Sequence, residues 1–417
     1  MLKKIPLLIQ IIIAILLGII LGKFASKDLV ISKAFSINFV RILVTFSDIF
    51  GQLLKFLIPL IILAFIAPGI GALAKGAGKL LGITTAFSYG STVISGLTAF
   101  ITASVLYPII LQGQSIANFG NPEEALLKGY FIIEIPAPMQ VMSALVLSFV
   151  LGLGMSVLKT DALFKVMDEF RIIIENMLEK VIVPILPFYI LGVFANMTAA
   201  GQITGIINVF IKVFVMILIL HLTILIFQYT VAGIMTKQNP FKMIKIMLPA
   251  YFTALGTQSS ASTIPVTLKS AKKMGVKEEV ANFAIPLCAT IHLSGSTITL
   301  VSCSTAVFFM QHGMLPSWGL MIKFILLLGV TMVAAPGVPG GAVVAALGIL
   351  SSVLGFDEAM LSLMIALYIA QDSLGTACNV TGDGAIAAVT AVFVKNEEEK
   401  EKEKATQIEK VQINEVI

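Results

Sequence analysis

Polar residues interrupt a long apolar segment near the C-terminal end of the sequence, between Gln371 and Asp383. Asp372, Thr376, Asn379 and Asp383 follow one another at i, i+4, i+7 and i+11, which places them on one face of a helix. An ionised side chain in hydrocarbon is costly unless it meets a partner, so such residues favour a functional role. The stripe therefore predicts a binding site within a membrane, and the ligand has to be inferred from the surrounding elements.

The composition is that of an integral membrane protein. The chain has 417 residues, of which 58% are hydrophobic and 12% charged, and its mean hydropathy is +0.99. A soluble domain of this size carries about twice that share of charged residues. The net charge of +5 fits basic cytoplasmic loops, and no feature favours binding of nucleic acid. Cys288, Cys303 and Cys378 lack metal-ligand spacing and are predicted to be small buried residues.

Long apolar segments recur along the whole chain. They lie at residues 5–24, 38–73, 83–111, 128–156, 170–199, 203–235, 246–266, 278–311, 319–354 and 358–394. The first is predicted to be a retained helix, because no small-residue cleavage site follows it. Loops rich in lysine, such as the one with Lys237, Lys242 and Lys245, are expected in the cytoplasm together with both termini.

Two of these segments are predicted to enter the membrane and return. Residues 246–268 have lysines on both flanks and a hydroxyl-rich centre, Gly256–Thr263, which favours a turn at membrane depth. The second break is the Pro- and Gly-rich stretch Ala334–Ala342. A polar-interrupted helix follows each, the first of them at Thr290–Ser296, and such pairs are typical of inverted repeats in secondary transporters. We therefore predict an all-α membrane protein with eight transmembrane helices and two re-entrant helical hairpins.

Residues 245–395 resemble the dicarboxylate/amino acid:cation symporter family, which includes the glutamate transporter homologues. The motifs that carry the resemblance are Gln258–Pro265, the loop Gly337–Gly340 and Asn379–Val–Thr–Gly–Asp383. The resemblance implies an elevator-type transporter, usually a homotrimer, in which a mobile transport domain moves against a scaffold. The implied division is residues 1–235 as mainly scaffold, 236–395 as transport core and 396–417 as a charged cytoplasmic tail. The resemblance leaves open whether the third and sixth helices belong to the scaffold or move with the transport core.

The resemblance also implies roles for individual residues. Asp372 occupies the position of the carboxylate that binds the substrate ammonium group, and Asn379 that of the amide that binds the substrate carboxylate, with Thr376 one turn before it. The tips of the two hairpins, which close over the substrate, are represented by Ser259 and Ser260 in the first and by Val338 and Gly340 in the second.

Two sodium sites are implied in the same way. The first contains Asp383 with backbone oxygens near Cys288, His292 and Asn379, and the second contains Thr290 and Leu293 with carbonyls near Ala334 and Ala335. Sodium is thus expected as a coupling ion, and no cofactor is expected.

Two departures from the family pattern bear on substrate and coupling. Members that carry acidic substrates have an Arg before the matching Thr, where this sequence has Gly375, so a second substrate carboxylate loses its counter-ion. The pattern Gln371–Asp372–Ser373 with Asn379 resembles the serine/threonine:sodium symporter branch instead. His292 and Ser294 replace an Asn and an Asp that are tied to a third sodium site. Because imidazole titrates near neutral pH, His292 is a candidate proton carrier, with hydrogen-bonded packing as its alternative.

The sequence thus predicts sodium-coupled symport of a small neutral amino acid, in a bacterial-type inner membrane and surrounded by lipid. The alternatives are a proton- or sodium-coupled carrier of cystine, another amino acid or a dicarboxylate, the last with Lys323 as a cationic partner. An anion channel is an alternative of another class, since hairpins and helix ends also build pores. Neither a Ser/Lys dyad, a metal-ligand cluster nor a paired-aspartate motif favours an enzyme. His221 and Asp48 are expected to be satisfied buried or interfacial polar groups.

Overall fold

The computed structural model describes residues 7–26, 30–75, 78–111, 126–158, 160–201, 203–332, 335 and 340–393, and these residues form helices and no strand. The predicted hairpin residues Ala334 and Val338, and the charged tail 396–417, lie outside the described residues. The all-α class predicted from the sequence is confirmed for the part of the chain that is described.

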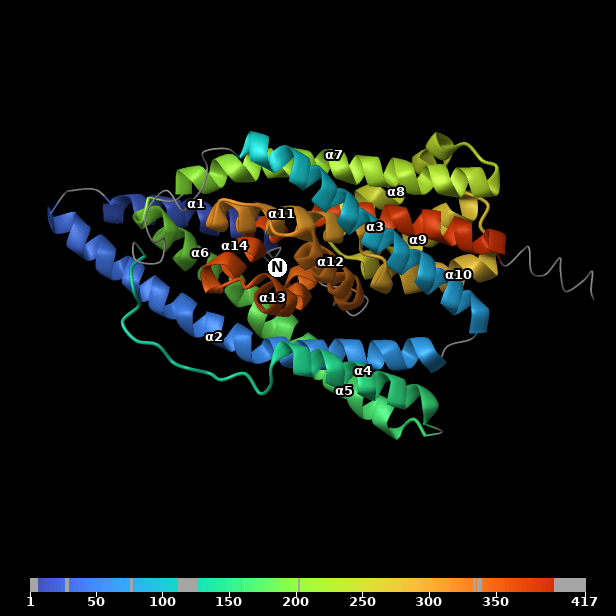
Figure 1. The fold of residues 1–417 in the computed structure, drawn as a ribbon, viewed down its shortest axis with the longest axis horizontal. Coiled ribbons are helices and arrows are strands. Elements are labelled where there is room, and N and C mark those ends of the chain that lie inside the picture. The colour runs from blue at the N-terminus through green and yellow to red at the C-terminus, as the bar shows by residue number, and fades with distance from the viewer. Residues whose placement is uncertain are drawn as a thin grey trace, which may run out of the picture.

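One group of helices forms an outer layer along α2 (Figure 1). Helix α1 packs on α6, and α2 packs on α4, α5 and α6. The group comprises α1 (Leu7–Ser26), α2 (Val30–Lys75), α4 (Val141–Val157), α5 (Ala162–Met177) and α6 (Val183–Ala199), with a π-helical turn, Leu178–Ile182, between the last two. A π turn here is consistent with Pro184, which has no N–H to donate to the turn before it.

The other helices surround α11 (Ser294–His312), whose residues are almost all buried. Both α3 (Gly78–Ile110) and α7 (Ile203–Thr236) pack on α11, and in Figure 1 α3 runs obliquely across the core while α7 runs along its upper edge. Helix α10 (Glu278–Ile291) precedes it, and α14 (Glu358–Ile369) packs against it. The last described helix, Asp372–Phe393, continues α14 after a bend of 61°. Thus the two helices left open from the sequence, α3 and α7, contact the core that contains the polar residues.

The two predicted hairpins are present as pairs of packed helices. The first consists of α8 (Pro240–Thr257) and α9 (Ser260–Lys273), joined by Gln258 in a left-handed conformation with φ 53° and by Ser259. The second consists of α12 (Trp318–Met332) and α13 (Gly341–Leu354), which pack against each other. Gly340, with φ 75°, leads into α13, and this positive φ is one that glycine adopts without strain.

Five of the described helices are long and apolar enough to cross a membrane, or six if the bent pair α14 and Asp372–Phe393 is one span. Helices α1 and α4 are apolar but shorter in the described residues, so the full set of eight spans stays a prediction. The segment predicted at 128–156 is helical only from Val141. Residues 128–140 have no regular secondary structure. Pro136 and Pro138 lack a backbone donor, and the backbone N–H of Tyr130 donates to Thr45 Oγ1 at 2.8 Å rather than to a helix.

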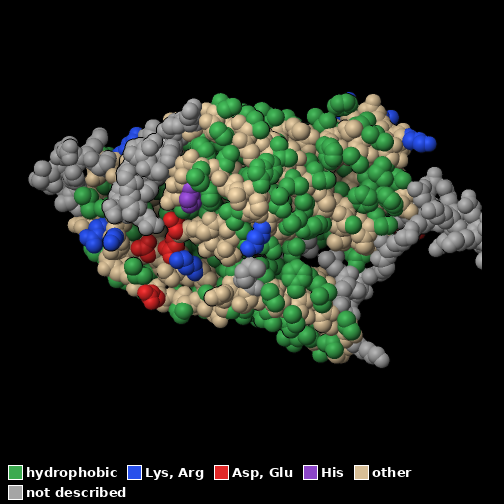
Figure 2. Space-filling view, in the orientation of Figure 1, with side chains coloured by type: hydrophobic (Ala, Val, Ile, Leu, Met, Phe, Trp, Pro, Cys, Tyr) green, Lys and Arg blue, Asp and Glu red, His purple; other side chains and the backbone are tan. Residues whose placement is uncertain are grey.

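The surface agrees with a membrane environment. Hydrophobic side chains cover most of the face in Figure 2, and acidic side chains gather at one end of it. Large apolar residues stay exposed on several helices, including Ile109 on α3, Val150 on α4 and Ile219 on α7. Contiguous apolar surface of this kind is rare on soluble monomers and needs lipid or a partner to cover it. The described residues are those of a multi-pass membrane protein.

A seam separates the outer layer from the core, where α13 and α14 meet α2 and α6. Polar contacts across it include the ion pair between Lys55 Nζ and Glu358 Oε1 at 2.5 Å. Gln52 Nε2 also donates to Glu358 Oε1 at 3.1 Å, and the hydroxyl of Tyr189 contacts that of Ser362. Apolar packing, such as that of Ile58 and Ile62 beneath Gly348, makes up the neighbouring surface.

Candidate functional site

A small cavity lies where the two hairpins meet the broken helices. Its volume is about 30 Å³, which is room for roughly one water molecule. The cavity is lined by Gln258, Ser260, Ala289, Leu293, Ser296, Ala335, Ala342, Tyr368, Asp372, Thr376 and Asn379. Three residues of the predicted stripe therefore face the same space as both hairpins, which the spacing of the stripe alone could not establish.

Asp372 is held by the second hairpin. Its side chain is 5% exposed, and its Oδ2 atom accepts a hydrogen bond from the backbone N–H of Gly340 at 2.8 Å. Tyr368 and Thr376 line the same cavity beside it. Gly340 caps α13, so the carboxylate lies at the positive end of that helix. The hairpin tip and Asp372 are thus directly connected.

Asn379 caps a helix to which it does not belong. Its Oδ1 atom accepts from the backbone N–H groups of Gly295 at 2.7 Å and Ser296 at 3.2 Å, which are unpaired donors of the first turn of α11. Its Nδ2 atom donates to Ser296 Oγ at 2.9 Å. The approach requires glycine, because a Cβ at Gly295 would lie 2.5 Å from the carbonyl oxygen of Gly375.

The two serines predicted at the first hairpin tip have different places. Ser260 lines the cavity together with Gln258. Ser259 is the N-cap of α9, and its Oγ atom accepts from the backbone N–H of Ser262 at 3.3 Å. The structure therefore brings Ser260 to the cavity and gives Ser259 a capping contact.

Gly375 borders the cavity region through the backbone of α11. A Cβ at this position would lie 3.5 Å from Ser296 N and 3.6 Å from the carbonyl carbon of Gly295, which are ordinary van der Waals distances. An alanine would therefore fit at this position, and Gly375 itself is not among the residues that line the cavity.

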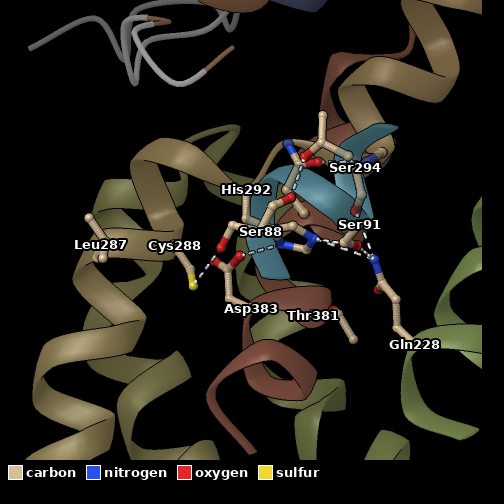
Figure 3. A network of polar contacts seen from close by, with 12 residues as sticks. Ser88, Ser91, Gln228, Leu287, Cys288, His292, Ser294, Thr381 and Asp383 are labelled. Atoms are coloured by element: carbon tan, nitrogen blue, oxygen red, sulfur yellow. Dashed lines mark hydrogen bonds and ion pairs between the residues drawn. The ribbon is translucent and has the colours of Figure 1, made fainter. Parts of the chain in front are cut away.

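A second polar cluster, shown in Figure 3, lies around the break between α10 and α11. His292 Nδ1 is 2.9 Å from Asp383 Oδ1, and both side chains are 1% exposed. On the other side of the ring, His292 Nε2 is 3.0 Å from Ser91 Oγ. Gln228 Nε2 donates to Ser91 Oγ at 2.8 Å and to Ser294 Oγ at 3.2 Å. The cluster joins α3, α7 and α11 to the helix that contains the stripe.

The remaining predicted cation ligands are divided between this cluster and the cavity. Cys288 is buried, with its Sγ atom 3.5 Å from Ser88 Oγ, and its carbonyl accepts from the backbone N–H of His292 at 2.8 Å. Leu293 and Ala335 line the cavity. The hydroxyl of Thr290 donates to the carbonyl of Leu287 at 2.8 Å, and its side chain is exposed.

A larger crevice of about 820 Å³ lies at the seam and contains none of the predicted site residues. Asp48, Lys55, Asp357 and Glu358 are among its lining, so the carboxylate of Asp48 is interfacial, as expected. His221 is buried as expected, with Nε2 3.0 Å from the carbonyl oxygen of Gly295. Because the crevice contains none of the residues that the resemblance assigns to the substrate, and the small cavity contains Asp372, Thr376 and Asn379, the small cavity is the candidate substrate site.

Several residues of these sites were missed by the sequence reasoning. Tyr368 and Ser296 line the cavity, and Ser91 and Gln228 belong to the polar cluster. Gln228 could have been found, because a buried amide in a long apolar helix is rare without a functional or structural partner. No local signal distinguishes Tyr368 from a packing tyrosine.

Comparison with known proteins gives a consistent result. The model of the sodium:dicarboxylate symporter family matches residues 7–393. An excitatory amino acid transporter of Caenorhabditis elegans is 27% identical over 272 residues, or 63% of this chain and 53% of that protein. Excitatory amino acid transporter 2 of Homo sapiens is 28% identical over 262 residues, or 60% of this chain and 44% of that protein.

The matched region thus spans about half the length of these curated relatives. The family match, in contrast, extends over nearly all described residues and includes both hairpins and both polar clusters. A family of symporters carries out transport rather than catalysis of a chemical reaction. The chain therefore belongs to the sodium:dicarboxylate symporter family, which is a family of transport proteins and not of enzymes.

Proposed function

We propose that this protein is a secondary transporter that carries a small neutral α-amino acid together with sodium. The observation that carries the proposal is the lining of the cavity, where Asp372 and Asn379 face hydroxyl groups and no lysine, arginine or histidine is present among the described residues. The carboxylate suits an ammonium group, and the amide with the hydroxyls suits a carboxylate. A zwitterion with an uncharged side chain matches this set.

The same lining disfavours a second substrate carboxylate. Such a group would be buried without a counter-ion, which costs several kcal/mol, on the order of 3–5 for a broken buried pair. Lys323, the cationic partner considered from the sequence, is exposed on α12 and does not line the cavity. The proposed substrate, a neutral amino acid, thus differs from the dicarboxylate after which the family is named.

The proposed sodium coupling is supported by how closely the two polar clusters are connected. Asp383, the proposed cation ligand, contacts His292 at the break before α11. Asn379, the proposed substrate ligand, caps the first turn of α11 a few residues later. A cation and a substrate that order the same backbone bind with a reciprocal coupling free energy.

The proposed transport step is an elevator movement of the core, residues 236–395 with α3 and α7, against the outer layer. Its support is that α3 and α7 pack on α11, while the outer helices pack mainly on one another. Entry of substrate requires the second hairpin to open, because the cavity of about 30 Å³ is smaller than any amino acid. A homotrimer in a bacterial-type inner membrane, with both termini cytoplasmic, is part of the same proposal.

Uptake by purified protein in liposomes tests the function. Radiolabelled serine is offered with and without an inward sodium gradient, and threonine, alanine, cystine, glutamate and succinate are used as competitors. We expect sodium-driven serine uptake that threonine inhibits and glutamate does not. Inhibition by succinate or glutamate alone would refute the neutral substrate, and ionic current without saturable uptake would favour an anion channel.

Replacement of Asp383 by Asn should weaken sodium binding more than serine binding. The change keeps the size of the side chain and removes its charge, so a bound cation loses its compensating carboxylate. We expect the sodium concentration for half-maximal uptake to rise at least about tenfold, which corresponds to about 1.4 kcal/mol. Asp168→Asn, on the outer helix α5, is the control and should leave the sodium dependence unchanged. An unaltered sodium dependence in Asp383→Asn would remove this residue from the cation site.

Proton coupling is the second candidate, and the contact between His292 and Asp383 favours it. An imidazole 2.9 Å from a carboxylate in a fully buried position is a pair that can hold a proton in place of a cation. The test is uptake driven by a pH gradient at constant sodium. Uptake that depends on the pH gradient and not on sodium would support proton coupling. His292→Asn should then abolish the dependence of uptake on the pH gradient.

A further inference from the structure

The imidazole of His292 lies between a carboxylate and two neutral polar side chains. Its Nδ1 atom is 2.9 Å from Asp383 Oδ1. Its Nε2 atom is 3.0 Å from Ser91 Oγ and 3.4 Å from Gln228 Nε2. Figure 3 shows the carboxylate on one side of the ring and the other two groups on the opposite side. Because these partners differ in what they can donate, they indicate which ring nitrogen carries hydrogen.

The amide nitrogen of Gln228 can only donate hydrogen bonds. It donates to Ser91 Oγ at 2.8 Å and to Ser294 Oγ at 3.2 Å, and it lies 3.4 Å from His292 Nε2. A hydrogen on His292 Nε2 would face this donor, whereas a lone pair on the same atom is attracted to it. The contact with Gln228 therefore favours an Nε2 atom without hydrogen.

The hydroxyl of Ser91 leads to the same assignment. Its oxygen accepts a hydrogen bond from Gln228, so its own hydrogen needs an acceptor. Among the described residues, the second contact of this hydroxyl is His292 Nε2, which is therefore the acceptor. In a neutral imidazole one nitrogen donates and the other accepts, so Nδ1 carries the hydrogen and donates it to Asp383 Oδ1.

Close packing keeps the amide and the imidazole beside the carboxylate. Gly382 directly precedes Asp383 in the chain. A Cβ at Gly382 would lie 2.6 Å from Gln228 Oε1 and 2.7 Å from His292 Cε1, so a side chain here would displace one or both groups. Gln228 is 5% exposed and His292 is 1% exposed. The three groups thus form one buried unit, to which α3 and α7 each contribute a side chain.

We propose that Gln228 and Ser91 are positioning residues of the proposed cation site, which act by holding His292 as a hydrogen-bond donor to the cation-binding carboxylate. The inference rests on the proposed function, because it takes Asp383 as a sodium ligand. A neutral donor to Oδ1 leaves the carboxylate its charge, fixes its orientation and keeps Oδ2 outside this hydrogen bond. Groups that orient a metal ligand without touching the metal commonly change its affinity by about 10- to 100-fold.

NMR of the histidine nitrogens tests the assignment directly. The chain contains three histidines, so isotope-labelled protein in liposomes gives few signals, and those of His292 are the ones lost in His292→Asn. Near neutral pH we expect a neutral ring with hydrogen on Nδ1. Hydrogen on Nε2 alone, which a turned-over Gln228 amide would produce, would overturn the inference. Hydrogen on both nitrogens, which a stored proton would produce, would overturn it as well.

The sodium dependence of serine uptake tests the positioning role. Ser91→Ala and Gln228→Met each remove hydrogen bonds around the ring and leave Asp383 in place. We expect the sodium concentration for half-maximal uptake to rise about tenfold in each variant, with the maximal rate at saturating sodium within about twofold. The double variant should add little, because both residues act through the same ring. Ser91→Thr keeps a hydroxyl and should keep the original sodium dependence.

Ser95→Ala is the matched control on α3. It removes a buried hydroxyl one turn further along, which donates to the backbone carbonyl of Ser91 at 2.7 Å, and it should leave the sodium dependence unchanged. An unchanged sodium dependence in both Ser91→Ala and Gln228→Met, or a lower maximal rate alone, would overturn the inference while the proposed function stands. Absence of sodium-driven uptake by the unmodified protein would refute the proposed function and this inference with it.

Discussion

Asp372→Asn should lower serine uptake at least about a hundredfold. Asparagine can still accept the hydrogen bond from the backbone N–H of Gly340, so the contact with the second hairpin is retained. What is lost is the negative charge opposite the substrate ammonium group. Loss of one member of a buried ion pair costs about 3–5 kcal/mol, and a hundredfold change corresponds to about 2.8 kcal/mol. The measurement is initial uptake at low serine concentration in proteoliposomes.

Two further measurements make this result interpretable. The amount and elution profile of the purified variant must match those of the unmodified protein, which separates a binding defect from misfolding. Asp168→Asn, the same change on an outer helix, should retain uptake. Robust serine uptake by Asp372→Asn would exclude this carboxylate as the ammonium-binding group.

Gly375→Arg should reverse the charge preference of the site. A guanidinium group pairs with a carboxylate through two parallel hydrogen bonds, and it would provide the counter-ion that acidic substrates lack here. The same group would be buried and unpaired beside a neutral substrate. We therefore expect aspartate to become an effective competitor and the affinity for serine to fall, with a change of at least about a hundredfold in the ratio of the two.

The position itself can accept a side chain, which makes the experiment feasible. The three atoms nearest to a Cβ at Gly375 would be backbone atoms of Gly295 and Ser296, at 3.5 to 3.6 Å. Gly375→Ala is therefore the control and should keep the preference for serine. A folded Gly375→Arg variant that still prefers serine to aspartate would show that residue 375 does not determine the charge of the substrate.

Much of the fold could be predicted because its signals are local. Lysines on both flanks of residues 246–268, with a hydroxyl-rich centre, predict a hairpin, and α8 and α9 form one. The spacing of Asp372, Thr376 and Asn379 predicts a shared face, and all three line the cavity. The failure at residues 128–140 has a local cause as well, since hydrophobicity alone does not reveal that two prolines prevent a helix.

The parts that could not be predicted depend on contacts between distant segments. Asn379 fits a ligand motif, yet its Oδ1 atom also caps α11, more than 80 residues earlier in the chain. Tyr368 precedes the 61° bend by a few residues, and only the folded chain brings its side chain into the cavity together with Asp372. Ser259 and Ser260 are adjacent and chemically identical, and only the left-handed turn at Gln258 directs one to the cavity and the other to the helix end.

The seam between the core and the outer layer has a consequence for how easily the two can slide. Apolar contacts have no preferred direction, so a surface such as that around Ile58, Ile62 and Gly348 can shift by one side chain and find equivalent neighbours. Hydrogen bonds and ion pairs have direction and a short range, and a shift leaves their partners unsatisfied. Resistance to sliding is therefore concentrated at the polar contacts, which are those of Glu358 with Lys55 and Gln52 and that between the hydroxyls of Tyr189 and Ser362. In the proposed elevator movement, the apolar part of the interface would therefore offer little resistance, and the energy barrier would arise mainly where these few polar contacts have to break and form again.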